Sequence, residues 1–342
     1  MHDFCLYAIY MRLYPCFGKN EMSSLQATET SVPAGTRGMR SLFEDSTPLL
    51  DDPTALRARA ERDGYLFFKQ LLPAEPLLEL RRQMLEICAR RGLLAPGRDL
   101  MEGALDTDAL NQIPDDQMRT DVGVPHEAYH AVQKLELFHA IPHHPKLQSL
   151  YRTLFGKEAI PHPRHIARMI TPHRSVFPTP PHQDFIHVQG ALQTWTCWFP
   201  LGNCPREMGS LTVLRGSHRN GVVAVAPAKG AGDLAAILCP HEIDWVEGDF
   251  ELGDILTFPS TTVHRALRSQ YRDRIRLSSD VRFQAIDDEI HEASLKPHVD
   301  YPWEDLYQGW KNPEIQYYWK KHDLHFSDWD PSVRWQKERI CT

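Results

Sequence analysis

Apolar residues in the first half of the chain recur at the spacing of a helix. The most regular set lies three or four residues apart and would form one apolar face: Leu77, Leu80, Met84 and Ile87. Gly92 then ends this helix, because glycine readily adopts the left-handed conformation found just after helices. Asp52 before Pro53 is a typical helix start, so another helix is predicted to run to about Arg62.

The rest of the first half is predicted to hold one short strand, a long loop and two more helices. The apolar run 65–68 is typical of a strand, and residues 95–124 are rich in Asp, Pro and Gly, as loops are. Helices are expected at about 126–140 and 145–155. The part from 51 to 156 is therefore predicted to be mainly helical.

The pattern changes at about residue 164, where short runs separated by Pro and Gly turns replace the helical spacing. The predicted strands are 165–171, 184–189, 193–199, 210–214, 254–258 and 274–283. Strands with few helices between them favour an antiparallel sandwich or barrel over a βαβ fold. Two short helices crowded with Trp and Tyr are expected afterwards, at 303–310 and 313–322.

These elements are interpreted as one domain, 39–342, of a mainly β fold with helical additions. Its β-rich core spans about 160–285, and an aromatic helical tail, 286–342, follows. Residues 1–38 are expected to be a disordered extension, because they include a Ser-, Thr- and Gly-rich stretch and show no periodic apolar face.

Composition and charge argue against several classes of protein. The net charge of −7 argues against a nucleic-acid-binding protein, which needs a basic patch. The chain has no run of about 18 apolar residues, so no membrane span is expected. Asp3 and Arg12 interrupt its partly apolar start, so no signal peptide is expected. The 7 cysteines are odd in number and form no C-x-x-C pair, which predicts reduced thiols in a cytoplasmic protein.

Residues 126–130 spell H-E-x-x-H, a pattern found in zinc hydrolases. His126 and His130 would share one face of a helix, with Glu127 as the base. The longer form of the motif needs a histidine where this chain has Glu136. A polar, exposed helix start accounts for the same residues, and a zinc hydrolase stays only an alternative.

A second pattern, His182-Gln183-Asp184, suits a different metal. On an extended chain the side chains of His182 and Asp184 point the same way, so an imidazole and a carboxylate can reach one ion. One more histidine would complete the two-histidine, one-carboxylate face of non-haem iron(II) sites. His298 and Asp300 have the same spacing, but an aromatic helical tail follows them and no strand pattern does.

Strands and glycine turns follow His182 along the chain. Gly209 precedes one predicted strand, and Gly253-Asp254 begins another, which leads to His264. This context distinguishes the His182 pair from the His298 pair.

The predicted strand at 274–283 has one polar and one apolar face. The polar face holds Arg274, Arg276, Ser278, Asp280 and Arg282. A solvated face over a buried one is the commoner cause of such alternation. The same residues would also line a barrel interior that binds an anion, because arginine pairs with carboxylates in bidentate fashion. The sequence leaves both interpretations open.

Residues from about 64 to 283 resemble the phytanoyl-CoA dioxygenase family of iron(II)/2-oxoglutarate oxygenases. The marks that carry the resemblance are Gly64-Tyr65-Leu66-Phe67-Phe68, His182-Gln183-Asp184, Gly209, Gly216-Ser217-His218, Gly253-Asp254, His264 and Arg274. Met208 and Arg215 stand where the family usually has Asn and Pro, which does not touch the proposed site. The resemblance implies a double-stranded β-helix, that is, a jelly-roll core.

The resemblance also implies a metal site and a reaction. His182, Asp184 and His264 would bind iron(II) and act as the catalytic centre. The reaction would consume O₂ and 2-oxoglutarate, release succinate and CO₂, and hydroxylate a C–H bond of a small organic substrate, with ascorbate as reductant in vitro. No identity for the substrate follows. A jelly-roll binding protein without turnover is the alternative from another class.

The resemblance further assigns the cosubstrate site. Arg274 would bind the distal carboxylate of 2-oxoglutarate, and Trp198 would lie beside it. Arg276 is the alternative anchor, but the spacing of Arg274 from His264 fits the family better. No oligomeric state is predicted.

Overall fold

The computed structural model describes residues 41–335, 337–339 and 341. They belong to one compact unit, which begins at residue 40. The predicted disordered extension, 1–38, lies outside the described residues.

Helices dominate the chain as far as residue 156. They are α1 (Pro53–Asp63), α2 (Ala74–Arg90), α3 (Thr107–Gln112), α4 (His126–Gln133), α5 (Glu136–Ala140) and α6 (Pro145–Phe155). Asp52 caps α1, where its carboxylate accepts hydrogen bonds from the backbone N–H groups of Thr54 and Ala55. Gly64 and Gly156 end α1 and α6 in the left-handed conformation. The sequence patterns therefore located these helix ends within about a residue.

Two larger sheets form the β-rich part. The major sheet has the order β2 (Leu66–Phe68), β12 (Ile255–Pro259), β7 (Trp195–Pro200), β14 (Arg276–Ala285) and β5 (Ala159–Pro161), with β6 (Ile166–Ile170) also paired to β14. The minor sheet has the order β1 (Ser41–Leu42), β11 (Trp245–Glu247), β8 (Leu211–Leu214) and β13 (His264–Ala266). All pairs in the two sheets are antiparallel except β1 with β11. Two small ribbons join β3 (Met118–Arg119) to β4 (Val124–Pro125) and β9 (Val225–Pro227) to β10 (Leu234–Ala236).

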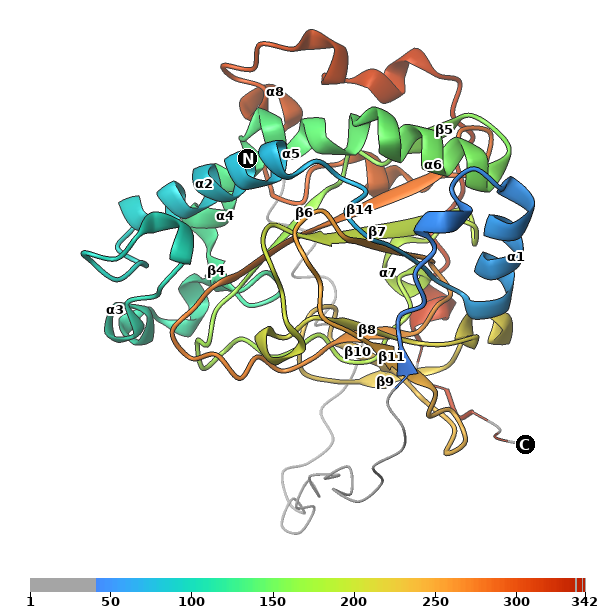
Figure 1. Cartoon of the computed structure of the whole chain (residues 1–342), viewed down its shortest axis with the longest axis horizontal. Coiled ribbons are helices and arrows are strands. Elements are labelled where there is room, and N and C mark those ends of the chain that lie inside the picture. The colour runs from blue at the N-terminus through green and yellow to red at the C-terminus, as the bar shows by residue number, and fades with distance from the viewer. Residues whose placement is uncertain (1–40, 336, 340, 342) are drawn as a thin grey trace, which may run out of the picture. The chain divides into compact units, whose positions relative to one another are not determined.

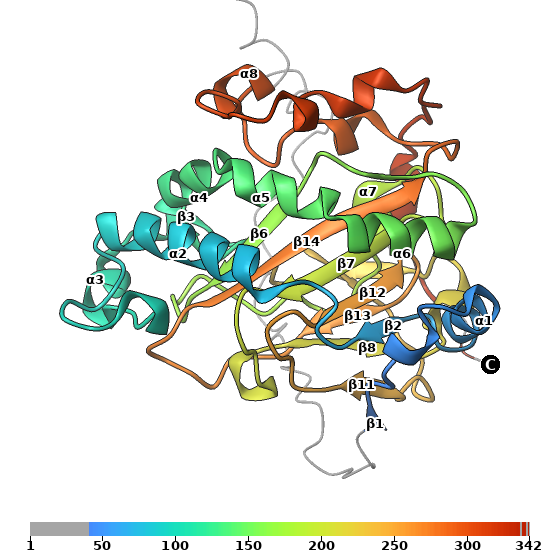
Figure 2. The same cartoon turned by 45° about the horizontal axis from the view of Figure 1, so that its top comes forward.

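The helices cover the outer face of the major sheet, where α2, α5 and α6 run across β14 and β7 (Figures 1 and 2). One apolar cluster joins the stripe on α2 to the odd-numbered positions Leu277, Val281 and Phe283 of β14. The even-numbered polar positions of β14 point the other way, into the space between the two sheets. Arg276 and Arg282 are only 5% and 6% exposed there. The polar face of this strand is thus interior, and the solvated-face interpretation is wrong.

The two sheets pack against each other through a second apolar cluster. Trp198 and Leu256 of the major sheet meet Val213 and Val246 of the minor sheet in it. Two antiparallel sheets face to face, with helices on one outer side, give the mainly β fold with a jelly-roll core that the sequence predicted.

Several predicted elements differ from the structure, and the helix expected at about 126–140 is two helices, α4 and α5. Residues 184–189, predicted as a strand, contain the short helix α7 (Phe185–Val188), because Asp184 already has helical backbone angles. The predicted loop 95–124 contains α3, capped by Asp106. In the tail, α8 (Trp303–Leu306) is shorter than expected, and 3₁₀ turns at Pro313–Ile315 and Tyr318–Lys321 replace the other helix.

The prediction that all cysteines are reduced thiols is also wrong. Cys239 and Cys341 form a disulfide between residues 102 positions apart. Cysteine spacing cannot reveal such a pair, because the approach of the C-terminal tail to the loop around Cys239 is a tertiary contact. Arg339 pairs with Glu242 beside the disulfide, at 2.6 Å. The remaining described cysteines, Cys88, Cys197 and Cys204, are buried thiols.

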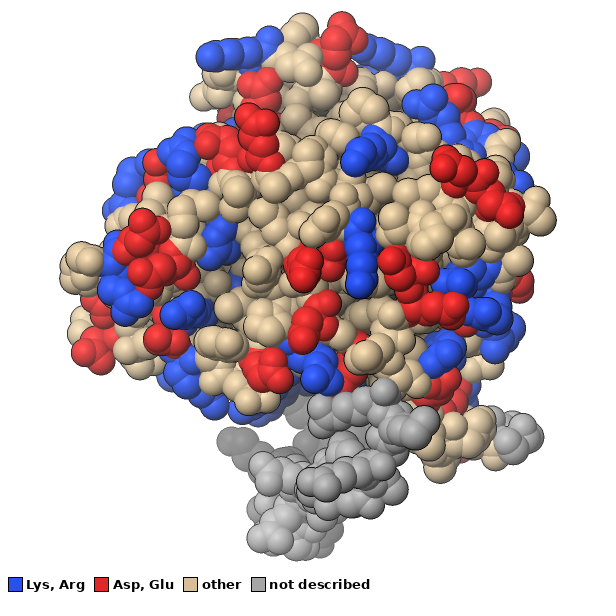
Figure 3. All heavy atoms as spheres, viewed as in Figure 1, with Lys and Arg blue, Asp and Glu red and all other residues tan. Residues whose placement is uncertain are grey.

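Surface charge is mixed on the face shown in Figure 3, where Lys and Arg are interspersed with Asp and Glu. Among the described helices, none combines the length and apolarity needed to cross a bilayer.

Candidate active site

His182 and His264 approach each other through their backbones. Each N–H donates to the carbonyl of the other at 2.9 Å, which forms an antiparallel bridge at the start of β13. Asp184 follows as the N-cap of α7, with φ −62° and ψ −30°. The sequence predicted that His182 and Asp184 lie on one extended strand. That prediction is wrong, because Asp184 has helical backbone angles. The turn nonetheless brings one ligand atom from each of the three residues within 4.8 Å of the others.

Gln183, between the two ligands, fixes this turn. Its side chain is fully buried, and its amide group donates to the carbonyls of Gly221 and Thr261 at 2.7 and 2.6 Å. Its carbonyl oxygen accepts from the N–H of Val223 at 2.8 Å. Three loop contacts thus hold Gln183 on the side away from the metal ligands.

The tautomers of both histidines follow from their backbone contacts. Nδ1 of His182 lies 2.9 Å from the carbonyl of Pro180, and Nδ1 of His264 lies 3.1 Å from that of Thr262. A carbonyl only accepts, so each Nδ1 carries the proton and each Nε2 keeps a free lone pair. The Nε2 atoms lie 3.6 and 3.8 Å from Oδ1 of Asp184, too far for hydrogen bonds to it.

Asp184 is held by two further side chains. The hydroxyl of Thr196, on β7, donates to its Oδ2, and Arg282, on β14, lies 3.2 Å from its Oδ1. Burial by itself raises the pKa of Asp184. The charge of Arg282 is the largest of the effects that oppose burial, and the pKa of Asp184 lies well below the usual range. The carboxylate is therefore ionised and available as a ligand.

These three residues fit a divalent metal. Two imidazole lone pairs and an ionised carboxylate, all buried, converge without bonding one another, and burial with the nearby His182 lowers the pKa of His264 to about 3. Two histidines and one carboxylate with open positions suit iron(II). No other group of three or more ligand-type side chains of this kind occurs in the described part of the chain.

His126 and His130 of the H-E-x-x-H pattern lie elsewhere, on α4. Their ring centres are 6.4 Å apart, and no third ligand-type residue among those described joins them. They line an outer cavity formed with the C-terminal tail.

A small cavity of about 30 Å³ extends from the metal ligands between the two sheets. Arg276 lies in its lining together with Trp198 and Thr196. The Arg276 guanidinium carbon is 5.9 Å from the centre of the Trp198 ring, and its Nη1 donates to the hydroxyl of Ser278 at 2.7 Å. Its buried Nε has no hydrogen-bond partner. A buried cation with unused donors faces the same space as the metal ligands.

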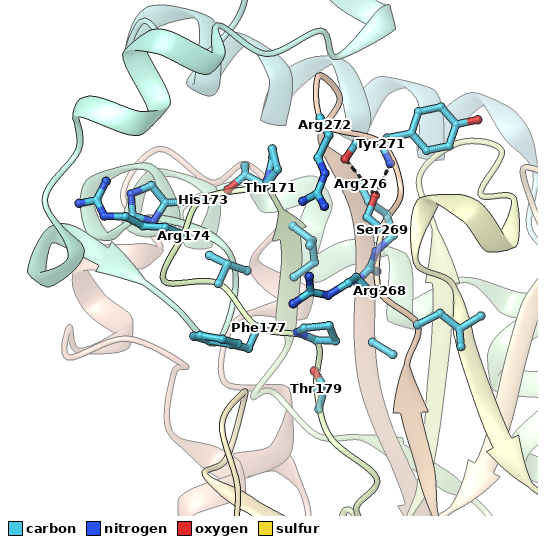
Figure 4. Close-up of a pocket in the computed structure, with 16 residues that line it drawn as sticks. Thr171, His173, Arg174, Phe177, Thr179, Arg268, Ser269, Tyr271, Arg272 and Arg276 are labelled. Carbon is cyan, nitrogen blue, oxygen red and sulfur yellow. Dashed lines mark hydrogen bonds between the residues drawn. The ribbon is translucent and has the colours of Figure 1, made fainter. Parts of the chain in front are cut away.

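Arg274 is placed differently. It is half-buried, and its backbone forms a bridge with Ala104 outside β14. It does not line the cavity that contains the metal ligands and Arg276. On the other side of Arg276 a second cavity of about 180 Å³ opens, and the side chains of Arg268 and Arg272 project toward it (Figure 4).

A larger cavity of about 470 Å³ also borders two of the metal ligands, His182 and Asp184. His182, Asp184 and Arg282 line its inner end, and Trp329 of the tail contributes to its wall. This volume is within the usual range for small-molecule sites.

Comparison with known proteins shows which family the chain belongs to. The family model described as Phytanoyl-CoA dioxygenase (PhyH) matches residues 60–274, more than half of the chain. The chain belongs to the PhyH family. As a PhyH-family protein with an assembled His-Asp-His site, it is an iron- and 2-oxoglutarate-dependent dioxygenase.

The individual proteins that resemble this PhyH-family protein share a quarter or less of the aligned residues with it. It is 24% identical over 269 residues to the 1-deoxypentalenic acid 11-beta-hydroxylase of Streptomyces arenae. This match covers 71% of this chain and 84% of the relative. The enzyme of the same name from Streptomyces exfoliatus is 25% identical over 255 residues, with the same coverage. Among solved structures, the epimerase SnoN in complex with Fe³⁺, alpha ketoglutarate and nogalamycin RO is 21% identical. The match covers 70% of this chain and 86% of that chain, with a TM-score of 0.48.

Sequence reasoning missed several residues of this PhyH-family site. Arg282 lay on the polar face of the predicted strand 274–283, and Thr196 lay in the predicted strand 193–199, so position along a strand was the available signal. No sequence signal could identify the carbonyls of Pro180 and Thr262, because every residue has a backbone carbonyl. Arg164, which lines the larger cavity, stands in a Pro- and His-rich loop with no pattern.

Proposed function

We propose that this protein hydroxylates a C–H bond of a small organic molecule in the larger cavity, with His182, Asp184 and His264 as the metal ligands. The observation that carries the proposal is the convergence of the two Nε2 lone pairs and the ionised Asp184 carboxylate at the inner end of that cavity, where His182 and Asp184 form part of the lining. When bound there, iron(II) with 2-oxoglutarate and O₂ supplies the oxidising power, and succinate and CO₂ are the other products.

The residues around the ligands act by fixing their geometry and charge. The carbonyls of Pro180 and Thr262 keep both Nε2 atoms unprotonated, and Thr196 orients the carboxylate of Asp184. All three ligands are less than a tenth exposed, so the protein keeps bulk water away from the reacting C–H bond.

Arg276 is proposed as the residue that binds the distal carboxylate of 2-oxoglutarate, in place of Arg274. The support is its position in the lining of the small cavity, its burial, and its Nε, which has no hydrogen-bond partner among the described residues. A dicarboxylate that reaches from the metal to Arg276 would receive a charge-assisted, bidentate contact. Trp198 would form the wall beside it.

The substrate class rests on two kinds of support. The larger cavity has the size of a small-molecule site, and two relatives are named as hydroxylases of 1-deoxypentalenic acid. With Asp184 in place, the protein fills three metal positions and leaves none that a halide could take once 2-oxoglutarate and O₂ are bound. Hydroxylation, or a related oxidation such as desaturation, is therefore expected rather than halogenation.

The test is succinate formation from 2-oxoglutarate with iron(II), ascorbate and O₂, measured for the native protein and two variants. His264→Ala should lose metal binding and succinate formation together. His130→Ala should keep both, because His130 lies outside the site. Zinc binding that depends on His130 would favour the hydrolase alternative. Metal and 2-oxoglutarate binding without any succinate would favour the non-catalytic jelly-roll protein.

A further inference from the structure

The larger cavity has an uneven charge. Its lining contains Arg164, Arg168 and Arg282 but only two carboxylates, those of Asp121 and Asp184. Apolar side chains, among them Ile166, Val188 and Trp329, make up another part of the wall. The charge that a ligand must supply depends on which of these arginines already pair with a carboxylate of the protein.

Arg168 has a carboxylate partner of its own. Its Nε donates to Oδ2 of Asp280 at 2.8 Å, a diagonal contact between the neighbouring strands β6 and β14. Asp121 is likewise occupied by Arg119, at 2.7 Å. These two pairs are balanced and leave no charge for a ligand.

Arg164 has no such partner. Its Nη1 donates to the carbonyl of Pro297 at 2.6 Å and to that of Lys296 at 3.4 Å, and no carboxylate among the described residues lies within ion-pair distance. Burial and the charge of Arg282 both lower the pKa of Arg164. A carbonyl dipole does not compensate a partly buried cation as a carboxylate does.

Arg282 is only partly satisfied. It is 6% exposed, its Nη2 contacts Oδ1 of Asp184 at 3.2 Å, and its buried Nε has no hydrogen-bond partner. A divalent metal bound by Asp184 adds positive charge at the same end of the cavity. 2-Oxoglutarate would be paired with Arg276 in the other cavity and would leave Arg164 unpaired.

Arg164 lies at the boundary between two cavities. It lines both the larger cavity and the outer cavity of about 900 Å³ that contains His126 and His130, and His298 is shared in the same way. The unpaired cation therefore lies where the inner cavity meets the outer one. The metal ligands lie at the other end of the inner cavity.

We infer that the substrate carries a carboxylate, which binds Arg164, while its apolar body extends along Ile166 and Val188 and presents a C–H bond to the metal. This rests on the proposed function and narrows it to apolar carboxylic acids. The carboxylate would pair the arginine of the cavity that has no carboxylate partner among the described residues, and it would hold the acid end away from the oxidising centre. Arg164 thereby acts as a determinant of specificity.

A structural role for Arg164 predicts something different. If it only holds the backbone at 296–297, its replacement by glutamine, whose amide can still donate to the Pro297 carbonyl, should not alter selectivity for charge. Arg57 offers a matched control, because its guanidinium also donates only to backbone carbonyls, those of Thr153 and Leu154, and it lines neither the inner nor the outer cavity.

The test is calorimetric titration of the protein loaded with Mn²⁺ and 2-oxoglutarate, so that no turnover occurs. The probes are matched pairs of equal shape that differ in charge: cyclohexanecarboxylate with its carboxamide, and adamantanecarboxylate with its carboxamide. The acid should bind roughly ten to a hundred times more tightly than the amide in at least one pair, as expected for a charge-assisted contact. Arg164→Gln should remove that preference, Arg164→Lys should keep part of it, and Arg57→Gln should leave it unchanged.

The outcomes separate this inference from the proposed function. Equal binding of acid and amide, no binding of any probe, or an acid preference that persists in Arg164→Gln would overturn the inference. Mn²⁺ and 2-oxoglutarate binding are measured on the same samples. If they are normal while the acid preference is absent, only the carboxylate inference fails; if they are absent, the proposed function fails as well. Equal melting temperatures of native protein and Arg164→Gln exclude misfolding as the cause.

Discussion

Arg276 is a cation held in the interior with the Ser278 hydroxyl and the Trp198 ring as its neighbours. Neither carries a compensating charge, and its Nε is unpartnered. Burying an unpaired charge is costly, so a dianionic ligand gains more from this residue than from an exposed arginine. A substitution of Arg276 should therefore weaken binding of the cosubstrate and leave binding of the metal almost unchanged.

Arg276→Leu should raise the KM for 2-oxoglutarate on the order of a hundredfold, because a bidentate, charge-assisted contact is worth a few kcal/mol. Iron affinity should change little. Arg274→Leu is the matched control and should leave the KM nearly unchanged, since Arg274 does not line the cavity. Steady-state succinate formation measures both. The reverse ranking would return the role to Arg274.

Thr196→Val should weaken metal binding about tenfold or more, because it removes the hydroxyl that donates to Oδ2 of Asp184 without changing the volume. The KM for 2-oxoglutarate should rise much less. Titration with Mn²⁺ gives the affinity directly. Native-like Mn²⁺ affinity in this variant would show that Arg282 alone is enough to orient the carboxylate.

At the scale of elements, the turn before β4 sets how closely the predicted loop region packs on β6. Gly123 has φ +94°, and a Cβ atom there would lie 2.8 Å from Cα of Ile170. The N–H of Met169 donates to the carbonyl of Val122 at 2.8 Å beside it. Only glycine permits both the left-handed conformation and this approach.

Gly123→Ala should therefore destabilise the fold by about 2–4 kcal/mol, the sum of the backbone strain and the backbone clash. Gly92→Ala is the control, because Gly92 has φ +69° but a Cβ there meets nothing within 4 Å. It should cost only about 1 kcal/mol. Urea unfolding compares the two. Equal losses would mean that the loop moves away from β6 freely.

At the scale of the whole molecule, the fold buries several histidines and keeps them neutral. Burial lowers the pKa of His139, His143 and His162 to about 4 in each case. The unfolded chain takes up these protons near pH 6.5, whereas the folded chain does so only near pH 4. Between those values protonation favours the unfolded state, so this stability is complete above about pH 6.5 and is lost as the pH falls toward 4.

The melting temperature should accordingly fall steeply from about pH 6.5 to about pH 4.5. His143→Phe should make that fall shallower, because it removes one titrating group and keeps a ring against Tyr318, whose centre lies 4.4 Å away. His322→Gln, at an exposed histidine, should leave the slope as it is. A calorimetric scan at several pH values measures the slopes. An unchanged slope in His143→Phe would contradict the assignment.

The sequence by itself determined the local elements, the candidate metal ligands and the family. Helix ends at Asp52, Gly64 and Gly156 depend on capping and glycine conformation, which act within a few residues. The alternation along β14 likewise defined which residues share a face, since the period of a strand is a local property. The resemblance then singled out His182, Asp184 and His264.

Only the tertiary structure decided what those faces meet. The polar face of β14 is interior because the minor sheet covers it, which strand alternation cannot show. Arg274 and Arg276 have the same parity, and only the end of the pairing with β6 places one in the cavity and the other beside Ala104. The disulfide between Cys239 and Cys341, the carbonyls that hold both histidines, and the unpaired Arg164 all depend on contacts between segments far apart in the chain. Such contacts arise from sheet pairing and packing, for which a single sequence carries no local signal.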